Sequence, residues 1–169
     1  MVRRCWLVLL ILGAACGGNK EIEPDLKHPS PLAVGLGEPQ KELDALMMRV
    51  QKGALPKIVF DVDSDKLRLE CTPTLDTVAS LLLRFSDVRA LVVAHADASG
   101  GEEHNLELSR RRAKAVMLYL VSRGVPPTSL RFRGLGSSQP AGDNATDEGR
   151  EKNRRVEFRL STRDWEAGW

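Results

Sequence analysis

Alternating apolar and polar residues mark several short segments of the chain as strands. Positions 58–63, 130–133 and 155–160 alternate in this way, which predicts strands with one apolar and one polar face. Positions 88–95 instead form a nearly continuous apolar run, as is typical of a central strand. The sequence therefore predicts a sheet with one apolar face and one charged face exposed to water.

Helical spacing of apolar residues separates these strands. It predicts a short amphipathic helix over positions 38–52 that ends at Gly53, and a long helix over about positions 103–122. Between them, Thr72 as N-cap and Pro73 at the first helical position predict the start of another helix. Because only one face of the sheet is apolar, we expect the helices to cover that face alone. The predicted fold class is therefore α+β, a two-layer α/β sandwich.

The first sixteen residues have the pattern of a secretion signal. Arg3 and Arg4 precede an eight-residue apolar run, and small residues then lead into Cys16. A membrane-spanning helix needs about 20 apolar residues, so this run is too short to be one. The small residues before the cysteine resemble a bacterial lipobox, which implies that residues 1–15 are removed and that Cys16 carries the lipid. Ordinary cleavage near Ala15 is the alternative.

Composition is typical of a globular protein, and removal of the signal changes its charge. The chain has 169 residues, which are too few for two full domains. Of these residues, 42% are hydrophobic and 28% are charged. The formal charge of +2 comes from Arg3 and Arg4. Without residues 1–15 the chain has 23 basic and 23 acidic residues and is therefore neutral. A neutral chain argues against nucleic acid as a partner. Cys71 is then the one remaining thiol, expected to be buried just before a helix, and no intramolecular disulfide is expected.

These patterns divide the chain into four segments. Residues 1–15 are the predicted lipoprotein signal peptide, and residues 16–55 are a lipid-anchored tether that includes the short amphipathic helix. Residues 56–162 are the predicted folded domain, and residues 163–169 are a C-terminal tail. We therefore expect one folded domain at the end of a flexible tether.

The most informative segment joins the apolar run at 88–95 to the long helix. Asp97 follows the run in a loop of small residues. At 100° per residue, Asn105 and Arg112 fall at the edge of the apolar band of the helix. The predicted band comprises Leu106, Ala113, Val116 and Leu120. The neighbouring cations predicted on the solvated face are Arg110, Arg111 and Lys114.

Arg112 is thus the cation of this helix that we expect near the core, beside the loop that carries Asp97. A carboxylate and a guanidinium held side by side can bind a zwitterion, because the carboxylate takes the ammonium group and the guanidinium takes the carboxylate. A structural ion pair between Asp97 and Arg112 is the alternative.

The same residues resemble the OmpA-like peptidoglycan-associating domain family over about residues 56–161. The resemblance rests on Asp97, Gly100, Asn105, Leu108, Ser109, Arg112, Ala113, Val116 and Leu120, then on Gly134-Leu135-Gly136, Pro140 and Asn153-Arg154-Arg155-Val156-Glu157. It implies a β-α-β-α-β domain with a mixed sheet that binds the diaminopimelate of the peptidoglycan stem peptide without catalysis. By position, Asp97 would take the ammonium group of that residue and Arg112 a carboxylate. The other implied binding residues are Asn105, Asp61 and Arg154.

Other kinds of site have little support in the sequence. His95 and Asp97 have no third ligand nearby, so we expect no metal; His95 is interpreted as a strand-end histidine with satisfied hydrogen bonds, and His104 as solvated. Gly134 and Gly136 predict a turn and not a phosphate-binding loop. No cofactor is expected.

The combined hypothesis is an outer-membrane lipoprotein whose domain lies in the periplasm and fastens the membrane to the cell wall. Its expected partners are peptidoglycan, the membrane through the lipid on Cys16, and other envelope proteins. One alternative is a periplasmic adaptor that binds another envelope protein. A wall-acting enzyme is the other, although no Ser-His-Asp pattern, metal set or second well-placed carboxylate supports it.

Overall fold

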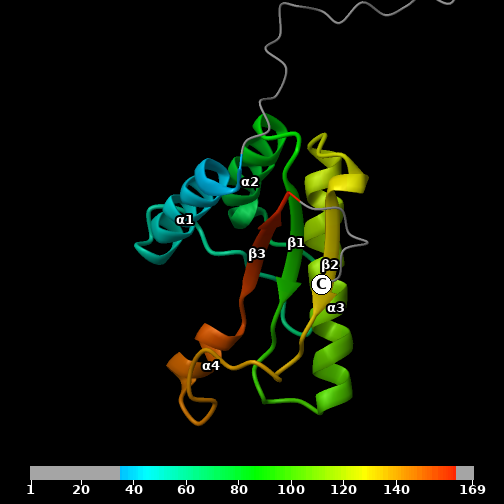
Figure 1. The fold of residues 1–169 in the computed structure, drawn as a ribbon. Coiled ribbons are helices and arrows are strands. Elements are labelled where there is room, and N and C mark those ends of the chain that lie inside the picture. The colour runs from blue at the N-terminus through cyan, green and yellow to red at the C-terminus, as the bar shows by residue number, and fades with distance from the viewer. Residues whose placement is uncertain (1–34, 163–169) are drawn as a thin grey trace, which may run out of the picture. The chain divides into compact units, whose positions relative to one another are not determined.

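The computed structural model describes residues 35–162, and Figure 1 shows how their helices and strands are arranged. The elements in chain order are α1 (Gly37–Gln51), α2 (Thr72–Arg84), β1 (Arg89–Ala94), α3 (Glu102–Ser122), β2 (Leu130–Gly134), α4 (Asp147–Asn153) and β3 (Val156–Ser161), with 3-10 turns at Leu69–Cys71 and Pro127–Ser129. None of the helices in this part of the chain has the length and hydropathy needed to cross a membrane. The predicted signal peptide, Cys16 and the tail at 163–169 lie outside the described residues.

β1 is the central strand of a three-stranded mixed sheet. The strand order is β2-β1-β3, with β1 parallel to β2 and antiparallel to β3. In this register Val92 lies opposite Phe132 on β2 and Phe158 on β3. β2 passes in front of α3 in Figure 1, and α3 packs on both β1 and β2 as well as on α2. The predicted α+β fold, with a mixed sheet and helices on one face, is confirmed.

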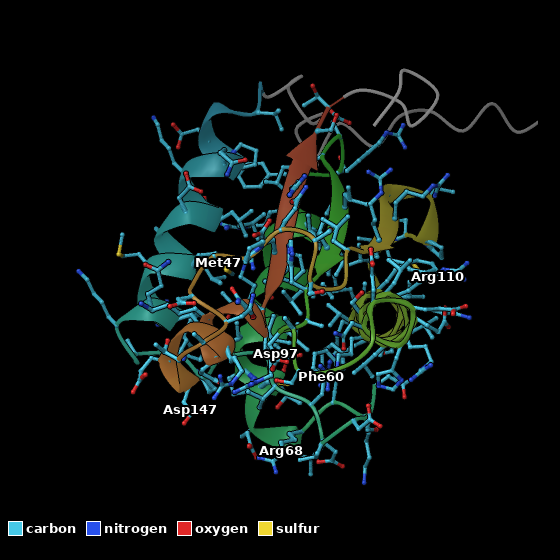
Figure 2. All side chains as sticks on the ribbon, turned by 90° about the horizontal axis from the view of Figure 1, so that it is seen from below. Met47, Phe60, Arg68, Asp97, Arg110 and Asp147 are labelled. Atoms are coloured by element: carbon cyan, nitrogen blue, oxygen red, sulfur yellow. The ribbon has the colours of Figure 1, made fainter. Side chains whose placement is uncertain are left out.

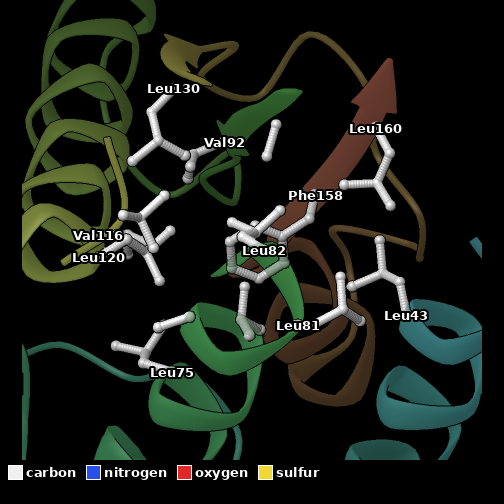
Figure 3. Close-up of a cluster of buried hydrophobic side chains, with 14 of the residues drawn as sticks. Leu43, Leu75, Leu81, Leu82, Val92, Val116, Leu120, Leu130, Phe158 and Leu160 are labelled. Atoms are coloured by element: carbon white, nitrogen blue, oxygen red, sulfur yellow. The ribbon is translucent and has the colours of Figure 1, made fainter. Parts of the chain in front are cut away.

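The core lies between the sheet and the helices, as Figure 3 shows. Alternate side chains of each strand point toward the helices and meet leucines and valines from α1, α2 and α3. Members that are almost completely buried include Leu75, Val78, Val92, Val116, Leu120 and Leu130. Each such side chain contributes about 1.5–3 kcal/mol to folding when it leaves water. This core holds α3 in a fixed position against the sheet.

No strand forms over 58–63, so this part of the prediction is wrong. Phe60 makes only an isolated antiparallel bridge with Leu67, and Val62 is 94% exposed. A tight turn interrupts the segment, in which Asp63 takes a φ of 48° in the left-handed region. The chain therefore doubles back after Phe60 and does not join the sheet.

Two details of the predicted helices are also wrong. Leu106, which was expected in the apolar band of α3, is 49% exposed, and Ser109 is fully buried instead. The reason is that α3 turns the side bearing Ser109 toward the end of β2. Thr72 is the first residue of α2 and not its N-cap, and its hydroxyl donates to a carbonyl of the preceding 3-10 turn at 2.8 Å.

The sequence does not predict α4, because its seven residues show no apolar periodicity. A cap marks its start: the hydroxyl of Thr146 accepts a hydrogen bond from Gly149 N at 3.0 Å. The helix predicted over 38–52 is confirmed as α1, and Gly53 follows its end with a φ of 73°. Cys71 is free and fully buried just before α2, as expected, and burial raises the pKa of its thiol.

Gly134 and Gly136 form the predicted turn at the end of β2, beside α3. A Cβ on Gly134 would lie 2.2 Å from Arg110 N, so only glycine fits between the strand and the helix. Gly136 has a φ of 52°, and its N–H donates to Ser109 Oγ at 2.8 Å. These contacts fix α3, and with it Arg112, at this end of the sheet.

Candidate functional site

Asp97 lies just beyond the carboxyl end of β1, in the loop that leads to α3. Its Oδ1 accepts a hydrogen bond from Ser99 N at 2.8 Å, and its Oδ2 lies 2.5 Å from Arg154 Nη1. Burial alone raises the pKa of the Asp97 carboxyl, but the Ser99 N–H and the Arg154 guanidinium outweigh burial and leave the pKa below its ordinary value. Asp97 is therefore a carboxylate at neutral pH and can accept further hydrogen bonds.

Arg154 follows α4 and is the ion-pair partner of Asp97, although the two residues are 57 positions apart. Its second amino group, Nη2, lies 2.6 Å from Glu151 Oε2. The carboxylates of Asp97 and Glu151 raise the pKa of the Arg154 guanidinium. Within residues 35–162 the ion pair of Asp97 is with Arg154 and none joins it to Arg112, so the alternative of a structural ion pair between Asp97 and Arg112 is wrong.

Asn105 is buried in the first turn of α3 and holds the loop that carries Asp97. Its Nδ2 donates to the carbonyl oxygens of Asp97 at 3.0 Å and of Gly100 at 3.1 Å. The fit is close, because a Cβ on Gly100 would lie 2.9 Å from Asn105 Oδ1. The contacts of Asn105 are therefore those of a residue that positions the backbone around Asp97.

Arg112 is 9% exposed, as the helical spacing predicted for a cation at the edge of the core. Its Nε donates to the carbonyl of Ser64 at 2.8 Å, and its guanidinium lies over the ring of Phe60, 5.1 Å from the centroid. Burial lowers the pKa of the guanidinium, and the nearby carboxylates of Asp63 and Asp97 oppose that shift. Arginine remains charged at neutral pH. The side chain is thus held in place from two sides.

The predicted binding residues meet around a single pocket of about 620 Å³, in the region labelled by Asp97 and Phe60 in Figure 2. Its lining includes Asp61, Asp97, Asn105, Arg112 and Arg154, which are the five binding residues expected from the sequence. Pockets of about 300–1,000 Å³ with a few fixed polar groups are typical of small-ligand sites. A neighbouring cavity of about 300 Å³ shares Arg112 and Arg154 and adds Arg68 and His95.

Asp61 and His104 lie at the exposed part of this pocket and are both paired. Asp61 Oδ1 accepts from Arg68 Nε at 3.2 Å, and Lys66 Nζ lies 3.7 Å from its Oδ2. His104 Nε2 lies 2.7 Å from Asp63 Oδ1, so His104 is exposed as expected but also has a carboxylate partner. The turn at 61–66 therefore places paired charged side chains at the rim of the pocket.

Asn144 and Asn153 support the site, and sequence reasoning missed this role. Asn153 is completely buried; its Oδ1 accepts from Ala141 N and Gly142 N at 2.7 and 2.8 Å. Its Nδ2 donates to Asn144 Oδ1 at 2.8 Å, and that oxygen also accepts from Ala98 N at 3.1 Å. The two asparagines thus connect α4 to the Asp97 loop. Only the Asn-Arg-Arg motif hinted at Asn153, and no sequence signal marked Asn144.

His95 differs from its predicted state. Within the described chain, neither ring nitrogen has a hydrogen-bond partner, although Glu157 Oε1 lies 3.5 Å from Nε2. The interpretation of a satisfied strand-end histidine is therefore wrong. Burial and then the charge of Arg155 lower the pKa of His95, while Glu157 partly opposes them. Residues 35–162 contain no group of three or more side chains placed to ligate a metal ion.

Fold and site together define an α+β domain with a charged pocket beyond the end of its central strand. The sequence profile of the OmpA family matches residues 59–154, which is more than half of the chain, and the chain belongs to that family. The resemblance found in the sequence is thereby confirmed.

Two relatives and one solved structure illustrate the similarity. Probable lipoprotein YiaD of Escherichia coli (strain K12) is 36% identical over 104 residues, which are 62% of this chain and 48% of that protein. The peptidoglycan-associated lipoprotein of Rhizobium meliloti (strain 1021) is 34% identical over 134 residues, 79% of this chain and 73% of that protein. The crystal structure of the peptidoglycan-associated lipoprotein from Burkholderia pseudomallei matches with a TM-score of 0.58 and 26% identity, covering 62% of this chain and 88% of that chain. The match to YiaD spans about half of that protein's length.

Proposed function

We propose that this protein binds peptidoglycan without catalysis and so fastens the outer membrane to the cell wall. One observation carries the proposal: Asp97 and Arg112 open into the same pocket and are not paired with each other. The similarity to proteins named peptidoglycan-associated lipoprotein adds support. Peptidoglycan stem peptides with diaminopimelate offer a free amino-acid end, whose ammonium and carboxylate groups suit such a pocket.

In the proposed complex, Asp97 accepts hydrogen bonds from the ammonium group, and Arg112 donates to the carboxylate of the same diaminopimelate. The Nε of Arg112 is already bound to Ser64, so its terminal amino groups are the ones that serve the ligand. Arg154 is paired with the Asp97 carboxylate before binding and lines the same pocket, so it is placed to share the ligand's carboxylate. Asn105 positions the Asp97 loop, and Asp61, paired with Arg68, lies at the rim.

The state of Asp97 supports binding and not acid–base chemistry. A general acid needs a carboxyl with a raised pKa, and the pKa of Asp97 is shifted downward. The groups around the pocket are also held by the protein before a ligand arrives, through Ser99, Ser64 and Phe60. Such preorganisation lowers the entropy cost of binding.

Co-sedimentation with purified peptidoglycan tests the proposal. The native protein is compared with Asp97→Asn and Arg112→Gln, and with Arg110→Gln as a matched control. Arg110 is an exposed arginine of the same helix, whose contact with Glu107 is 3.8 Å long. We expect the two site variants to bind at least about tenfold more weakly, which is about 1.4 kcal/mol, and the control to bind normally.

Two results would overturn the proposal in different ways. Undiminished binding by both site variants would refute the assignment of Asp97 and Arg112. Absence of sedimentation by the folded native protein would refute wall binding itself. Release of soluble wall fragments during the incubation would instead reveal an enzyme.

The proposed anchor is the lipid on Cys16, after removal of residues 1–15. The residue after Cys16 is Gly17 and not an aspartate, which in enteric bacteria would mean retention in the inner membrane, so the proposed destination is the outer membrane, with the domain in the periplasm. Intact-mass measurement of the membrane fraction tests this, with Cys16→Ser as the control. We expect a lipid increment in the native chain that is missing from the variant; an unlipidated native chain would overturn the anchor.

A further inference from the structure

A second cavity adjoins the pocket that contains Asp97. It has a volume of about 300 Å³, against about 620 Å³ for the pocket itself. In Figure 2, Phe60 lies between Asp97, which lines only the larger cavity, and Arg68, which lines only the smaller one. The residues that line both cavities are Phe60, Val62, Arg112 and Arg154. A ligand held by Asp97 and Arg112 can therefore extend directly into the second cavity.

The second cavity offers apolar surface to a ligand. The apolar residues of its lining are Ile58, Val59, Phe60, Val62 and Ala94. Val62 lines both cavities and is 94% exposed, so most of its side chain has no protein neighbour. A small aliphatic group of a ligand would leave water on contact with this surface, which favours its binding there.

Hydrogen-bond donors of two arginines remain available at the same cavity. The Nε of Arg112 donates to Ser64, whereas its Nη1 and Nη2 make no hydrogen bond within residues 35–162. Arg68 is paired with Asp61 through Nε and with Glu70 through Nη1, and its Nη2 makes no hydrogen bond within the same residues. Each guanidinium can therefore donate to a ligand oxygen and keep the contacts that it already has.

The other charged side chains of the second cavity are bonded to one another or to a neighbour. Glu151 Oε2 lies 2.6 Å from Arg154 Nη2, and Arg155 Nε lies 2.9 Å from Glu157 Oε1. The donors that can receive a ligand oxygen are thus those of Arg112 and Arg68.

Apolar surface beside guanidinium donors suits a small aliphatic amino-acid residue that carries a carboxylate. In peptidoglycan, the stem residue that follows diaminopimelate is alanine, which at the end of a stem has both a methyl group and a free carboxylate. We propose that the second cavity is the subsite for this terminal alanine, an inference that rests on the proposed wall binding. The methyl group packs against Val62 and Phe60, and the carboxylate accepts hydrogen bonds from Arg68 and Arg112.

Calorimetric titration of the full chain with three soluble peptides tests the subsite. They are the stem tripeptide amidated at the carboxyl to which alanine would be joined, the tetrapeptide that ends in alanine, and that tetrapeptide as its terminal amide. We expect the tetrapeptide amide to bind about threefold more tightly than the tripeptide amide, because it adds a methyl group. The tetrapeptide with a free carboxylate should bind about tenfold more tightly still.

Two variants separate the carboxylate from the methyl group. Arg68→Gln should lower the ratio of acid to amide affinity several-fold, whereas Lys66→Gln should not, since Lys66 is an exposed cation that also contacts Asp61 but lines neither cavity. Val62→Ser should remove the gain from the methyl group. Leu69→Ser is its control, because Leu69 is 85% exposed and lines neither cavity. Circular dichroism checks that each variant is folded, and the use of ratios cancels any change in the affinity for diaminopimelate.

The outcomes distinguish this subsite from the proposed wall binding. Equal affinity of the native protein for the tetrapeptide and the tripeptide amide would overturn the subsite alone, because all three peptides contain diaminopimelate. Gains that survive both Arg68→Gln and Val62→Ser would also overturn it. A loss of tripeptide-amide binding in Arg68→Gln, with no gain from alanine in the native protein, would place the glutamate that precedes diaminopimelate in the cavity instead. Failure of the folded native protein to bind any of the peptides would refute the diaminopimelate site itself.

Discussion

Asp97 is paired with Arg154, its Oδ2 lying 2.5 Å from Nη1, whereas Arg112 lies over Phe60 and donates to Ser64. Asp97 and Arg112 are therefore held in place by contacts with different residues. This arrangement keeps the Asp97 carboxylate charged before the ligand arrives and leaves the terminal amino groups of Arg112 for a ligand carboxylate. It also means that each charge can be removed without unpairing the other.

Arg154→Gln is expected to weaken wall binding more than it weakens the fold. Arg154 is 42% exposed, and partly exposed ion pairs contribute about 1 kcal/mol or less to stability. Loss of its charge next to the ligand should lower affinity about tenfold, roughly 1.4 kcal/mol. Urea unfolding and peptidoglycan co-sedimentation give the two values. A large loss of stability with unchanged binding would make the pair purely structural.

Arg112→Lys is expected to lose binding although it keeps the positive charge. Lysine has no planar group to lie over Phe60 and no Nε positioned for the Ser64 carbonyl. We expect an affinity loss of about tenfold or more, and a smaller loss in Phe60→Leu, where a cation–π contact of about 0.5–2 kcal/mol disappears. Arg111→Lys on the same helix is the control. Normal binding by Arg112→Lys would show that charge alone suffices.

His95 should make the fold sensitive to mild acid. Burial and Arg155 hold the folded pKa below the unfolded value of about 6.5, although Glu157 favours the protonated form. The unfolded chain therefore binds more protons in this range, so the His95 contribution is complete above about pH 6.5 and is lost as the pH falls through the folded pKa.

We expect the melting temperature to fall between about pH 7 and pH 5, and His95→Gln to flatten that slope. The carboxyls of Asp97 and Glu157 have lowered pKa values and lose their contribution only in stronger acid, below about pH 4. An equal slope in both proteins, measured by thermal unfolding in matched buffers, would contradict the role of His95.

Asn153→Ala should destabilise the fold by about 3 kcal/mol, because the groups bonded to its buried amide lose their partners. These are the N–H groups of Ala141 and Gly142, the Gly142 carbonyl and Asn144. Lys152→Ala, at an exposed neighbouring position of α4, is the control and should change stability little. Urea unfolding measures both, and a loss below about 1 kcal/mol for Asn153→Ala would show that water replaces the amide.

Local patterns were enough to predict much of this molecule. The continuous apolar run predicted the central strand β1, and helical spacing placed Arg112 at the edge of the core. Both depend on which face of one element is buried, and periodicity reports that property directly. The strand prediction from periodicity was wrong at 58–63, where a turn intervenes. Alternation over a few residues does not reveal that the chain reverses at Asp63.

The contacts that complete the site join distant segments, so no local pattern contains them. Arg154 reaches Asp97 across 57 positions, and Asn144 reaches Ala98 across 46. The resemblance marked Arg154 as a binding residue but did not identify its partner. Likewise, a buried histidine without hydrogen bonds cannot be distinguished in sequence from one with them, since the difference lies in the surrounding side chains of Arg155 and Glu157.

Calorimetric titration with two soluble stem peptides measures whether Arg112 recognises the carboxylate of the ligand. One peptide carries diaminopimelate at its third position and the other carries lysine, which keeps the ammonium group but lacks the carboxylate assigned to Arg112. We expect the native protein to bind the diaminopimelate peptide at least about tenfold more tightly, roughly 1.4 kcal/mol, and Arg112→Gln to abolish this preference. Equal affinity of the native protein for both peptides, or a preference that survives Arg112→Gln, would contradict it.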